Sequence, residues 1–174
     1  LGTVNNNTES PTLDLKAELR DFDLGFAQEF VKTIFGNFRG KATGDLIISG
    51  PLSDVDYSGD IELKNFGLRL LFTGVDYKFD DTVINLSKGQ ALLSGIGVSD
   101  GRDNSSGMIS GAIQFETLSS MAVNLIMEAN NLMVLNSTQE DNDLFWGKVY
   151  GKGDLYVSGP VSGLEISSPN MRSL

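Results

Sequence analysis

The side chains of this chain that could do chemistry are carboxylates, lysines and serines, because the sequence contains no histidine and no cysteine. Histidine is the commonest general base, and cysteine supplies thiolate nucleophiles, disulfides and metal ligands. No Ser-x-x-Lys pair occurs, and the sequence Asp-Asp-Thr at Asp80 lacks the glycine of an aspartic-protease motif. A carboxylate pair for glycoside hydrolysis stays open. We therefore expect a protein that is not an enzyme and has no catalytic residues.

Two runs are rich in side-chain oxygens, DGRDNSSG from Asp100 and QEDNDL from Gln139. A calcium ion takes about six to eight oxygen ligands, and neither run has the spacing of an EF-hand loop. Asp, Asn, Ser and Gly are also the residues that turns favour. The sequence has no Gly-x-x-x-x-Gly-Lys phosphate loop either. Both runs are interpreted as polar turns, and we expect no bound metal and no cofactor.

The chain of 174 residues has a formal net charge of −10. This charge repels phosphate backbones, so nucleic acid is not an expected partner. The chain also lacks the Lys and Arg clusters that bind anionic membrane surfaces, and no apolar run is long enough to span a bilayer. The polar start, LGTVNNNTESPT, is not a signal peptide. Any export signal or anchor is expected outside this segment.

Apolar residues recur at every second position over most of the chain, which predicts strands with one apolar and one polar face. VDYKFDD shows this pattern, with Val75, Tyr77 and Phe79 on one face. Roughly ten such strands are joined by short polar connections, so neighbours are expected to be antiparallel. A spacing of three and four predicts one short amphipathic helix over about 24–37. The expected organisation is a flexible segment 1–12, a single β domain 13–168, and a C-terminal tail or boundary 169–174.

A single antiparallel sheet with one apolar face has to cover that face. It can fold over on itself, close into a barrel, or form a groove that holds something else. The alternation alone does not separate side chains that line a groove from side chains that pack as a closed sandwich core. The candidate lining residues share the apolar side of their strands: Leu46, Ile48, Ile61, Leu63, Val75, Tyr77, Phe79, Val123, Leu125, Met127, Leu155 and Val157.

One strand-and-turn phrase occurs twice, as GDLIISGPLS from Gly44 and as GDLYVSGPVS from Gly153, with seven identical letters in ten. Proline has no N–H group, so each Gly-Pro pair is expected to end its strand in a turn. Shorter copies follow Ser58 and Ser110, where a glycine again precedes alternating apolar residues. The repetition predicts near-equivalent strands in one extended sheet.

The stretch FVKTIFGNFRGKATGDLIISGPLSDVDYSGDIELKN contains an apolar helix, then Gly-x-x-x-Gly-x-apolar-x-apolar-x-Gly-Pro, then a second glycine-led strand. This order resembles the TamB family of the AsmA-like group, the translocation and assembly module inner-membrane subunits with a DUF490-type C-terminal region. The resemblance covers roughly residues 13–168 and continues through VDYKFDDTVINLSKG. Later family positions are approximated here by Asp100, Gly107, Gly111, Leu135, Thr138, Asn142, Phe145 and Gly147.

The resemblance implies a mainly β fold, a long, curved, folded-over antiparallel sheet described as a β-taco, with an apolar groove inside. It also implies a periplasmic segment of an envelope protein of Gram-negative-type bacteria, anchored in the inner membrane. The implied roles are lipid transport, outer-membrane biogenesis and protein secretion. The implied partners are phospholipid or another apolar chain, an Omp85-type outer-membrane protein, and adjacent segments of the parent chain. The polar end ISSPNMRSL departs from the family, where another apolar strand is expected.

Two other functions stay open beside lipid carriage. The segment is alternatively a β-scaffold whose exposed sheet edge pairs with client strands by β-augmentation. A cell-surface β adhesin is the third possibility, and it requires a closed core and a carbohydrate-binding surface. We expect lipid carriage, because the resemblance favours a groove over a closed core.

Overall fold

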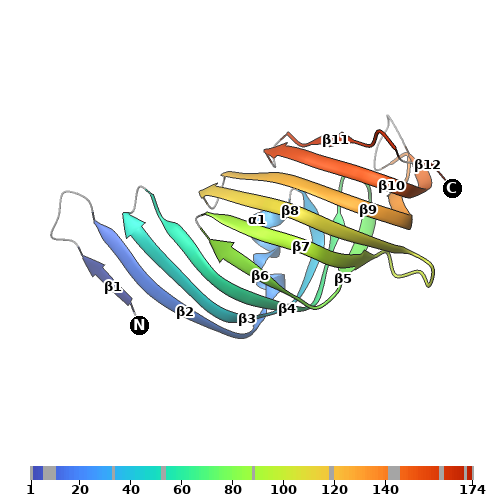
Figure 1. Ribbon diagram of the computed structural model, residues 1–174. Coiled ribbons are helices and arrows are strands. Elements are labelled where there is room, and N and C mark those ends of the chain that lie inside the picture. Colours follow the sequence, from blue (N-terminus) through green and yellow to red (C-terminus); the bar gives the residue numbers. More distant parts are fainter. Residues whose placement is uncertain are drawn as a thin grey trace.

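The structure is a computed structural model, and it describes residues 2–5, 11–32, 34–51, 54–87, 89–117, 120–140, 146–160, 163–170 and 172–173. These residues form twelve strands of one sheet and one short helical segment (Figure 1). The elements are β1 (Gly2–Asn5), β2 (Thr12–Asp23), η1 (Leu24–Ala27), α1 (Gln28–Val31), β3 (Phe35–Pro51), β4 (Asp56–Leu70), β5 (Val75–Phe79), β6 (Thr82–Ser87), β7 (Gln90–Ser99), β8 (Ser106–Thr117), β9 (Ser120–Ser137), β10 (Gly147–Pro160), β11 (Glu165–Ser167) and β12 (Arg172–Ser173).

The strands follow one another through the sheet almost in chain order, and each pair of neighbours among the described residues is antiparallel. This arrangement agrees with the short connections in the sequence, since adjacent antiparallel strands need only a tight turn between them. β4 is long enough to have two partners on one side. Its middle part pairs with β6 and its last four residues pair with β5, and both of these strands also pair with β7. The prediction of a mainly β, curved antiparallel sheet is confirmed.

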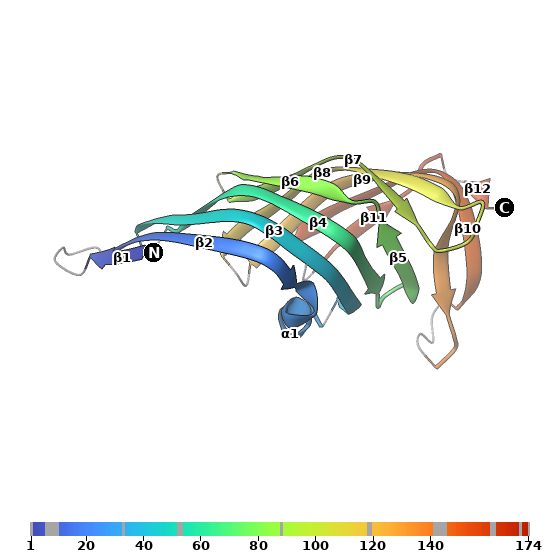
Figure 2. The same ribbon diagram turned by 90° about the horizontal axis from the view of Figure 1, so that it is seen from below.

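The two faces of the sheet differ as the alternation predicts. In β2, Leu15 and Leu19 are half-buried whereas Lys16 and Glu18 are exposed. Figure 2 shows the sheet as an arch with α1 on its inner side. Leu24 in η1, the turn that leads into α1, packs against the buried residues of the apolar face. The apolar face is therefore the concave one.

The four glycines that open the repeated phrase and its shorter copies lie within the strands and have a positive φ. Gly44, Gly59, Gly111 and Gly153 have φ of 155, 150, 134 and 135°. At Gly44, Gly59 and Gly111 a Cβ atom would collide with a carbonyl oxygen of the neighbouring strand. Only glycine combines this backbone conformation with so close an approach. We call these four residues the bend row. The repeated phrase and its shorter copies mark their positions in the sequence.

The Gly-Pro pairs of the two long copies end their strands in the same way. Their glycines have φ of 109 and 102°. The N–H of Asp54 donates to the carbonyl oxygen of Pro51 at 2.9 Å, and the N–H of Gly163 donates to that of Pro160 at 2.8 Å. The two phrases are therefore equivalent strand-and-turn units, one in β3 and the other in β10.

The helix is shorter than the spacing of its apolar residues predicts. The spacing predicts a helix over 24–37, whereas η1 and α1 together end at Val31 and β3 begins at Phe35. Phe35 pairs with Leu70 of β4, so hydrogen bonding between distant strands competes successfully with the local helical pattern. Phe26 faces solvent, and the predicted apolar helical face is therefore not fully covered.

The two terminal segments that the sequence sets apart from the β domain both contain a strand. In segment 1–12, β1 pairs with residues 12–15 of β2. In segment 169–174, β12 pairs with Gly151 and Lys152 of β10.

Candidate functional site

The most deeply buried part of the concave face lies where the sheet folds over on itself. Val75 and Leu132 are only 1% and 0% exposed. They belong to a buried group that we call the fold-over cluster: Val75, Tyr77, Val98, Met127, Ala129 and Leu132. Val75 and Tyr77 come from β5 and the last three residues from β9, although β7 and β8 separate these strands in the sheet. The cluster therefore joins parts of the sheet that are not neighbours, and it closes one end of the arch.

Two hydrogen bonds hold this closed end together. The hydroxyl of Tyr77 donates to the carbonyl oxygen of Met133 at 2.8 Å. The N–H of Asn136 donates to the carbonyl oxygen of Thr73 at 2.7 Å, which ties the end of β9 to the turn before β5. Burial raises the pKa of Tyr77, with a smaller contribution from Asp100, so its hydroxyl keeps its proton and remains a donor.

We expect Tyr77→Phe to lower the free energy of unfolding by about 1 kcal/mol, because the carbonyl oxygen of Met133 loses its donor inside a buried cluster. Urea denaturation followed by circular dichroism measures the change. Tyr156→Phe is the matched control, since Tyr156 is exposed on the opposite face and its loss of a hydroxyl should not change stability. Equal effects of the two substitutions would show that the Tyr77–Met133 bond contributes nothing.

A second buried group lies on the same face between β3 and β4. Ala42, Ile61 and Leu63 form it, and we call it the β3–β4 cluster. Its packed neighbours include Phe66, whose ring centroid lies 5.0 Å from that of Phe79, a neighbour of the fold-over cluster. The two clusters are thus connected through this pair of rings.

The structure places all twelve predicted lining residues on this concave face but in three different surroundings. Five belong to the fold-over cluster or pack against it, namely Val75, Tyr77, Phe79, Met127 and Leu155. Three belong to the β3–β4 cluster or pack against it, namely Leu46, Ile61 and Leu63. Four lie outside both clusters and are half-buried, namely Ile48, Val123, Leu125 and Val157.

The half-buried part of the face extends across β7 to β10 away from the closed end. Leu125 lies opposite Gly111 on one side and Val157 on the other, and Val123 lies opposite Ile113. All described strands belong to the same sheet, so among the described residues only η1 and α1 are available as a separate covering layer. Those two pack beside β3, and the half-buried residues of β8–β10 are not part of that contact.

Several residues of this face are missing from the predicted set. Ile84 and Leu86 of β6 pack against the β3–β4 cluster, and Leu132 of β9 is the most buried residue of the fold-over cluster. The same alternation marks Ile84 and Leu86 in the sequence. Leu132 follows Asn131, whose φ of 54° lies at a register shift between β9 and β10, so the alternation that includes Met127 and Ala129 does not predict it.

A buried carboxylate links the turn after β7 to β9 through hydrogen bonds. The side chain of Asp100 is 1% exposed and accepts hydrogen bonds from the guanidinium group of Arg102 and, at 2.6 Å, from the N–H of Met133. Arg102 also donates to the carbonyl oxygen of Asn131 at 2.6 Å and stacks 4.1 Å from the ring centroid of Tyr150. The run DGRDNSSG is therefore a structured clamp between β7, β9 and β10.

The pKa of Asp100 reflects this clamp. Burial alone would raise the pKa, but hydrogen bonds from Arg102, from Ser105 and from the backbone N–H groups of Met133 and Arg102 outweigh it. The pKa is lowered to about 2, so the carboxylate stays charged and keeps its acceptor role.

Residues 97–101 read Gly-Val-Ser-Asp-Gly, which matches the Gly-x-Ser-x-Gly spacing of a nucleophile elbow. Such an elbow places its serine between a strand and a helix, next to a histidine. Here Ser99 is the last residue of β7, it pairs with Lys78 of β5, and a turn leads on to strand β8. The chain has no histidine, and the surroundings of Ser99 differ from those of a catalytic elbow.

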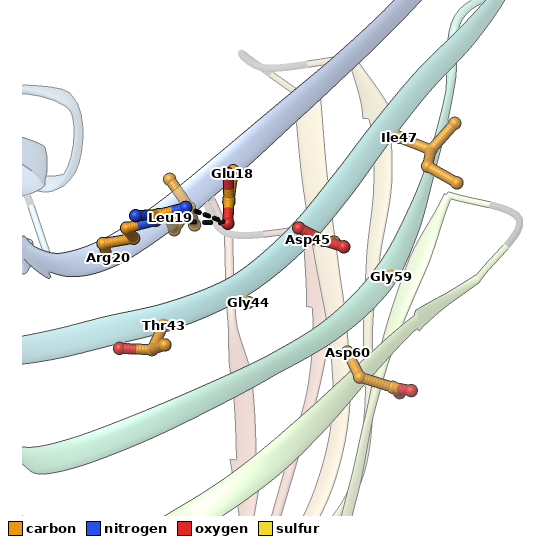
Figure 3. A pocket seen from close by; sticks show the side chains of 9 residues that line it. All are labelled: Glu18, Leu19, Arg20, Thr43, Gly44, Asp45, Ile47, Gly59 and Asp60. Atoms are coloured by element: carbon orange, nitrogen blue, oxygen red, sulfur yellow. Dashed lines mark hydrogen bonds and ion pairs between the residues drawn. The ribbon is translucent and has the colours of Figure 1, made fainter.

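The convex face carries hollows at the bend row, where glycines leave space beside them. The larger one, of about 650 Å³, lies around Gly44 and Gly59 and is shown in Figure 3. Its side chains are mostly polar, and Arg20 forms an ion pair of 2.7 Å with Glu18. None of the predicted lining residues belongs to it. The described residues include no group of three or more Asp or Glu side chains placed to hold a metal ion.

Comparisons with known proteins return no match to a family model, to a curated protein or to a solved structure. Among the described residues no helix has the length and hydropathy of a membrane span. Two of the positions that carry the resemblance to the TamB family, Asn142 and Phe145, lie outside the described residues.

Proposed function

We propose that this chain is a periplasmic segment of a TamB-like envelope protein that carries phospholipid acyl chains along its concave apolar face. The observation that supports this proposal most is the continuity of that face. It runs from the fold-over cluster along β9 and β10 to half-buried residues that lie outside both clusters, and the Phe66–Phe79 contact joins it to the β3–β4 cluster. An apolar chain that covers such half-buried side chains removes their surface from water, and this lowers the free energy of the complex.

The physical mechanism is solvation without covalent chemistry. Each CH₂ group removed from water contributes about 0.8 kcal/mol, whereas the charged headgroup is best left in water at the rim of the sheet. Neighbouring strands present alternating apolar side chains, so successive positions along the face offer an acyl chain similar surroundings. A lipid then moves along the face without a deep free-energy minimum at any one strand.

The proposal includes a context that comes from the resemblance. The parent protein is anchored in the inner membrane, adjacent segments extend the sheet, and an Omp85-type protein receives its outer-membrane end. In this role the segment needs no catalytic residue and no cofactor.

Lipid extraction tests the proposal directly. The protein is purified without detergent, extracted with organic solvent and analysed by mass spectrometry, and we expect about one phospholipid per chain. A matched soluble β protein from the same cells controls for carry-over. Recovery of no more phospholipid than in this control would contradict the proposal.

Single charges on the two faces separate carriage from folding. We expect Leu125→Arg to reduce bound phospholipid about ten-fold, because a guanidinium group on the apolar face must keep its water and excludes acyl chains. Ile126→Arg is the control, since Ile126 is the next residue, is also half-buried and lies on the convex face opposite Tyr156. The pair Leu46→Arg and Ile47→Arg repeats the comparison on β3.

Circular dichroism spectra and denaturation midpoints accompany these measurements. A folded Leu125→Arg protein that has lost its lipid supports carriage. An unfolded Leu125→Arg protein beside a folded Ile126→Arg protein would instead place Leu125 in an ordinary core.

One observation favours a second function, that of a scaffold for client strands. β1 pairs only with residues 12–15 of β2, so among the described residues the edge of β2 from Lys16 onwards has no partner strand. An extended client strand could add to this edge by main-chain hydrogen bonds. Photo-crosslinking from Glu18, with the convex residue Asp60 as control, tests this function. Capture of outer-membrane proteins at Glu18 alone would support it, and equal capture at both positions would refute it.

A further inference from the structure

Exposed aromatic side chains gather at one end of the strands. Phe26, Phe72 and Trp146 are 76, 57 and 59% exposed, and Phe22 and Leu71 are exposed beside them. In the described part of the chain every exposed Phe or Trp belongs to this group. We call it the aromatic rim, and it consists of Phe22, Phe26, Leu71, Phe72 and Trp146.

Contacts between distant segments place the rim residues along the same end. The rings of Phe22 and Phe26 lie with their centroids 6.0 Å apart where β2 leads into η1. The N–H of Leu71 donates to the carbonyl oxygen of Ile34 at 2.9 Å, which joins the β4–β5 turn to the segment after α1. Trp146 directly precedes β10, whose first residue pairs with Ser137 of β9. Figure 2 shows α1, the end of β4 and the start of β10 along the same lower side of the arch.

The backbone at these tips is bonded within the protein. The N–H of Ile34 donates to the carbonyl oxygen of Val31 at 3.0 Å, and that of Gly74 to the carbonyl oxygen of Leu70 at 2.8 Å. The Leu71–Ile34 bond and the Asn136–Thr73 bond of 2.7 Å link neighbouring tips to each other. A turn that enters an apolar layer needs such internal partners, because water is no longer there to supply them.

Three ion pairs lie beside the part of the rim that β2, η1 and α1 form. Lys41 lies 3.3 Å from Asp23 and Lys32 lies 2.7 Å from Glu29. Arg39 contacts Asp76 at 2.6 Å. The whole chain nevertheless carries a net charge of −10, which is repelled by anionic surfaces. Apolar side chains beside ion pairs, on a chain of negative net charge, suit a membrane surface that is apolar just below its headgroups and has no net charge.

We propose that the aromatic rim docks this protein on zwitterionic lipid bilayers, with the side chains of Phe26, Phe72 and Trp146 inserted at the headgroup level. Phe and Trp favour this layer because their rings are apolar and wide, and a few of them suffice for reversible binding. The proposal goes beyond lipid carriage, since the partner is the bilayer surface and the residues involved lie outside the concave clusters. Docking here places the closed end of the sheet against the membrane.

Trp146 is the sole tryptophan of the chain, so its fluorescence reports on the rim without a label. The complete chain is titrated with phosphatidylcholine vesicles, and binding is measured by flotation in parallel. We expect a blue shift of the emission, quenching by lipids brominated near the headgroup, and weaker binding when phosphatidylglycerol is added. Phe26→Ser and Phe72→Ser should each weaken binding about ten-fold, since each removes a large apolar side chain from the interface.

The control removes a comparable side chain from the convex face. Val83 is 60% exposed in β6, and we expect Val83→Ser to bind vesicles as the unchanged chain does. Absence of flotation, equal losses in Phe26→Ser and Val83→Ser, or binding that requires phosphatidylglycerol would overturn the proposal. A blue shift that grows with protein concentration in the absence of lipid would also overturn it, because the rim would then be a contact between copies.

The Leu125→Arg protein separates this proposal from lipid carriage. It should dock on vesicles like the unchanged chain even when it extracts no phospholipid. Loss of docking in the Phe26→Ser, Phe72→Ser double variant, with bound phospholipid unchanged, is the reverse result and would support the two functions as independent.

Discussion

Replacing Gly59 with alanine is expected to lower the free energy of unfolding by about 3 kcal/mol. Gly59 belongs to the bend row, and its φ of 150° is accessible almost only to glycine. The added Cβ atom would also collide with the carbonyl oxygen of Asp45 in β3. Since backbone cannot move aside as a flexible side chain can, either the bend or the pairing of β3 with β4 must give way.

Substitutions at two other glycines separate the cost of the steric collision from the cost of the backbone conformation. Gly147 has a φ of 135° but nothing within 4 Å of the added Cβ, so Gly147→Ala should cost only about 1 kcal/mol of backbone strain. Gly163 has neither constraint, and Gly163→Ala should stay within about 0.5 kcal/mol of the unchanged chain. Urea denaturation of the three variants measures the series. A Gly59→Ala protein as stable as the Gly163→Ala protein would show that the arch does not depend on the bend row.

Removal of the Asp100 carboxylate is expected to lower the free energy of unfolding by about 3 kcal/mol. The side chain is 1% exposed, and its loss in Asp100→Ala would leave the guanidinium group of Arg102 and the N–H of Met133 without their acceptor. These groups join β7, β9 and β10 at the closed end. The exposed residue Asp103 lies in the same turn, and Asp103→Asn should change stability by less than about 0.5 kcal/mol.

The same carboxylate makes the stability of the protein depend on pH. Its pKa of about 2 lies below the ordinary value of 3.8, so the folded protein holds the charged form more tightly than the unfolded chain does. The resulting stabilisation, about 2 kcal/mol, is fully present above about pH 5 and is lost as the pH falls through 3.8 towards 2 and below. Denaturation midpoints of the unchanged chain and of Asp100→Asn should therefore converge over this interval. A constant difference between them down to pH 2 would contradict a role for the charge.

The Asp100 prediction concerns the closed end of the arch, and it bears on how the proposed functions are divided along the sheet. The fold-over cluster, the Asp100 clamp and the Tyr77–Met133 bond make this end a rigid core. The half-buried residues around Leu125 lie away from it. A rigid closed end suits docking by the aromatic rim, whereas a less packed region suits a face that takes up and releases apolar chains.

The class of the fold and the division of the sheet into two faces follow from the order of apolar and polar residues along the chain. Alternation is a local property, because side chains two residues apart on a strand share a face whatever the strand pairs with. It therefore placed all twelve predicted residues on the concave face. The repeated glycine-led phrase was equally informative about the backbone. A residue with a positive φ at a close backbone approach has to be glycine, so the glycines mark these positions in the sequence.

Contacts between distant strands determine which of these residues form the core and where the helix ends. Val75 is buried because β5 meets β9 across the fold, and Leu125 is half-buried because no such contact reaches it; their local sequences carry no trace of this difference. The helical spacing over 24–37 likewise gives way at Phe35, where pairing with Leu70 supplies backbone hydrogen bonds to β4. The sequence around Asp100 has the composition of an ordinary polar turn. Its role as a clamp depends on the hydrogen bond from Met133, which is more than thirty residues away.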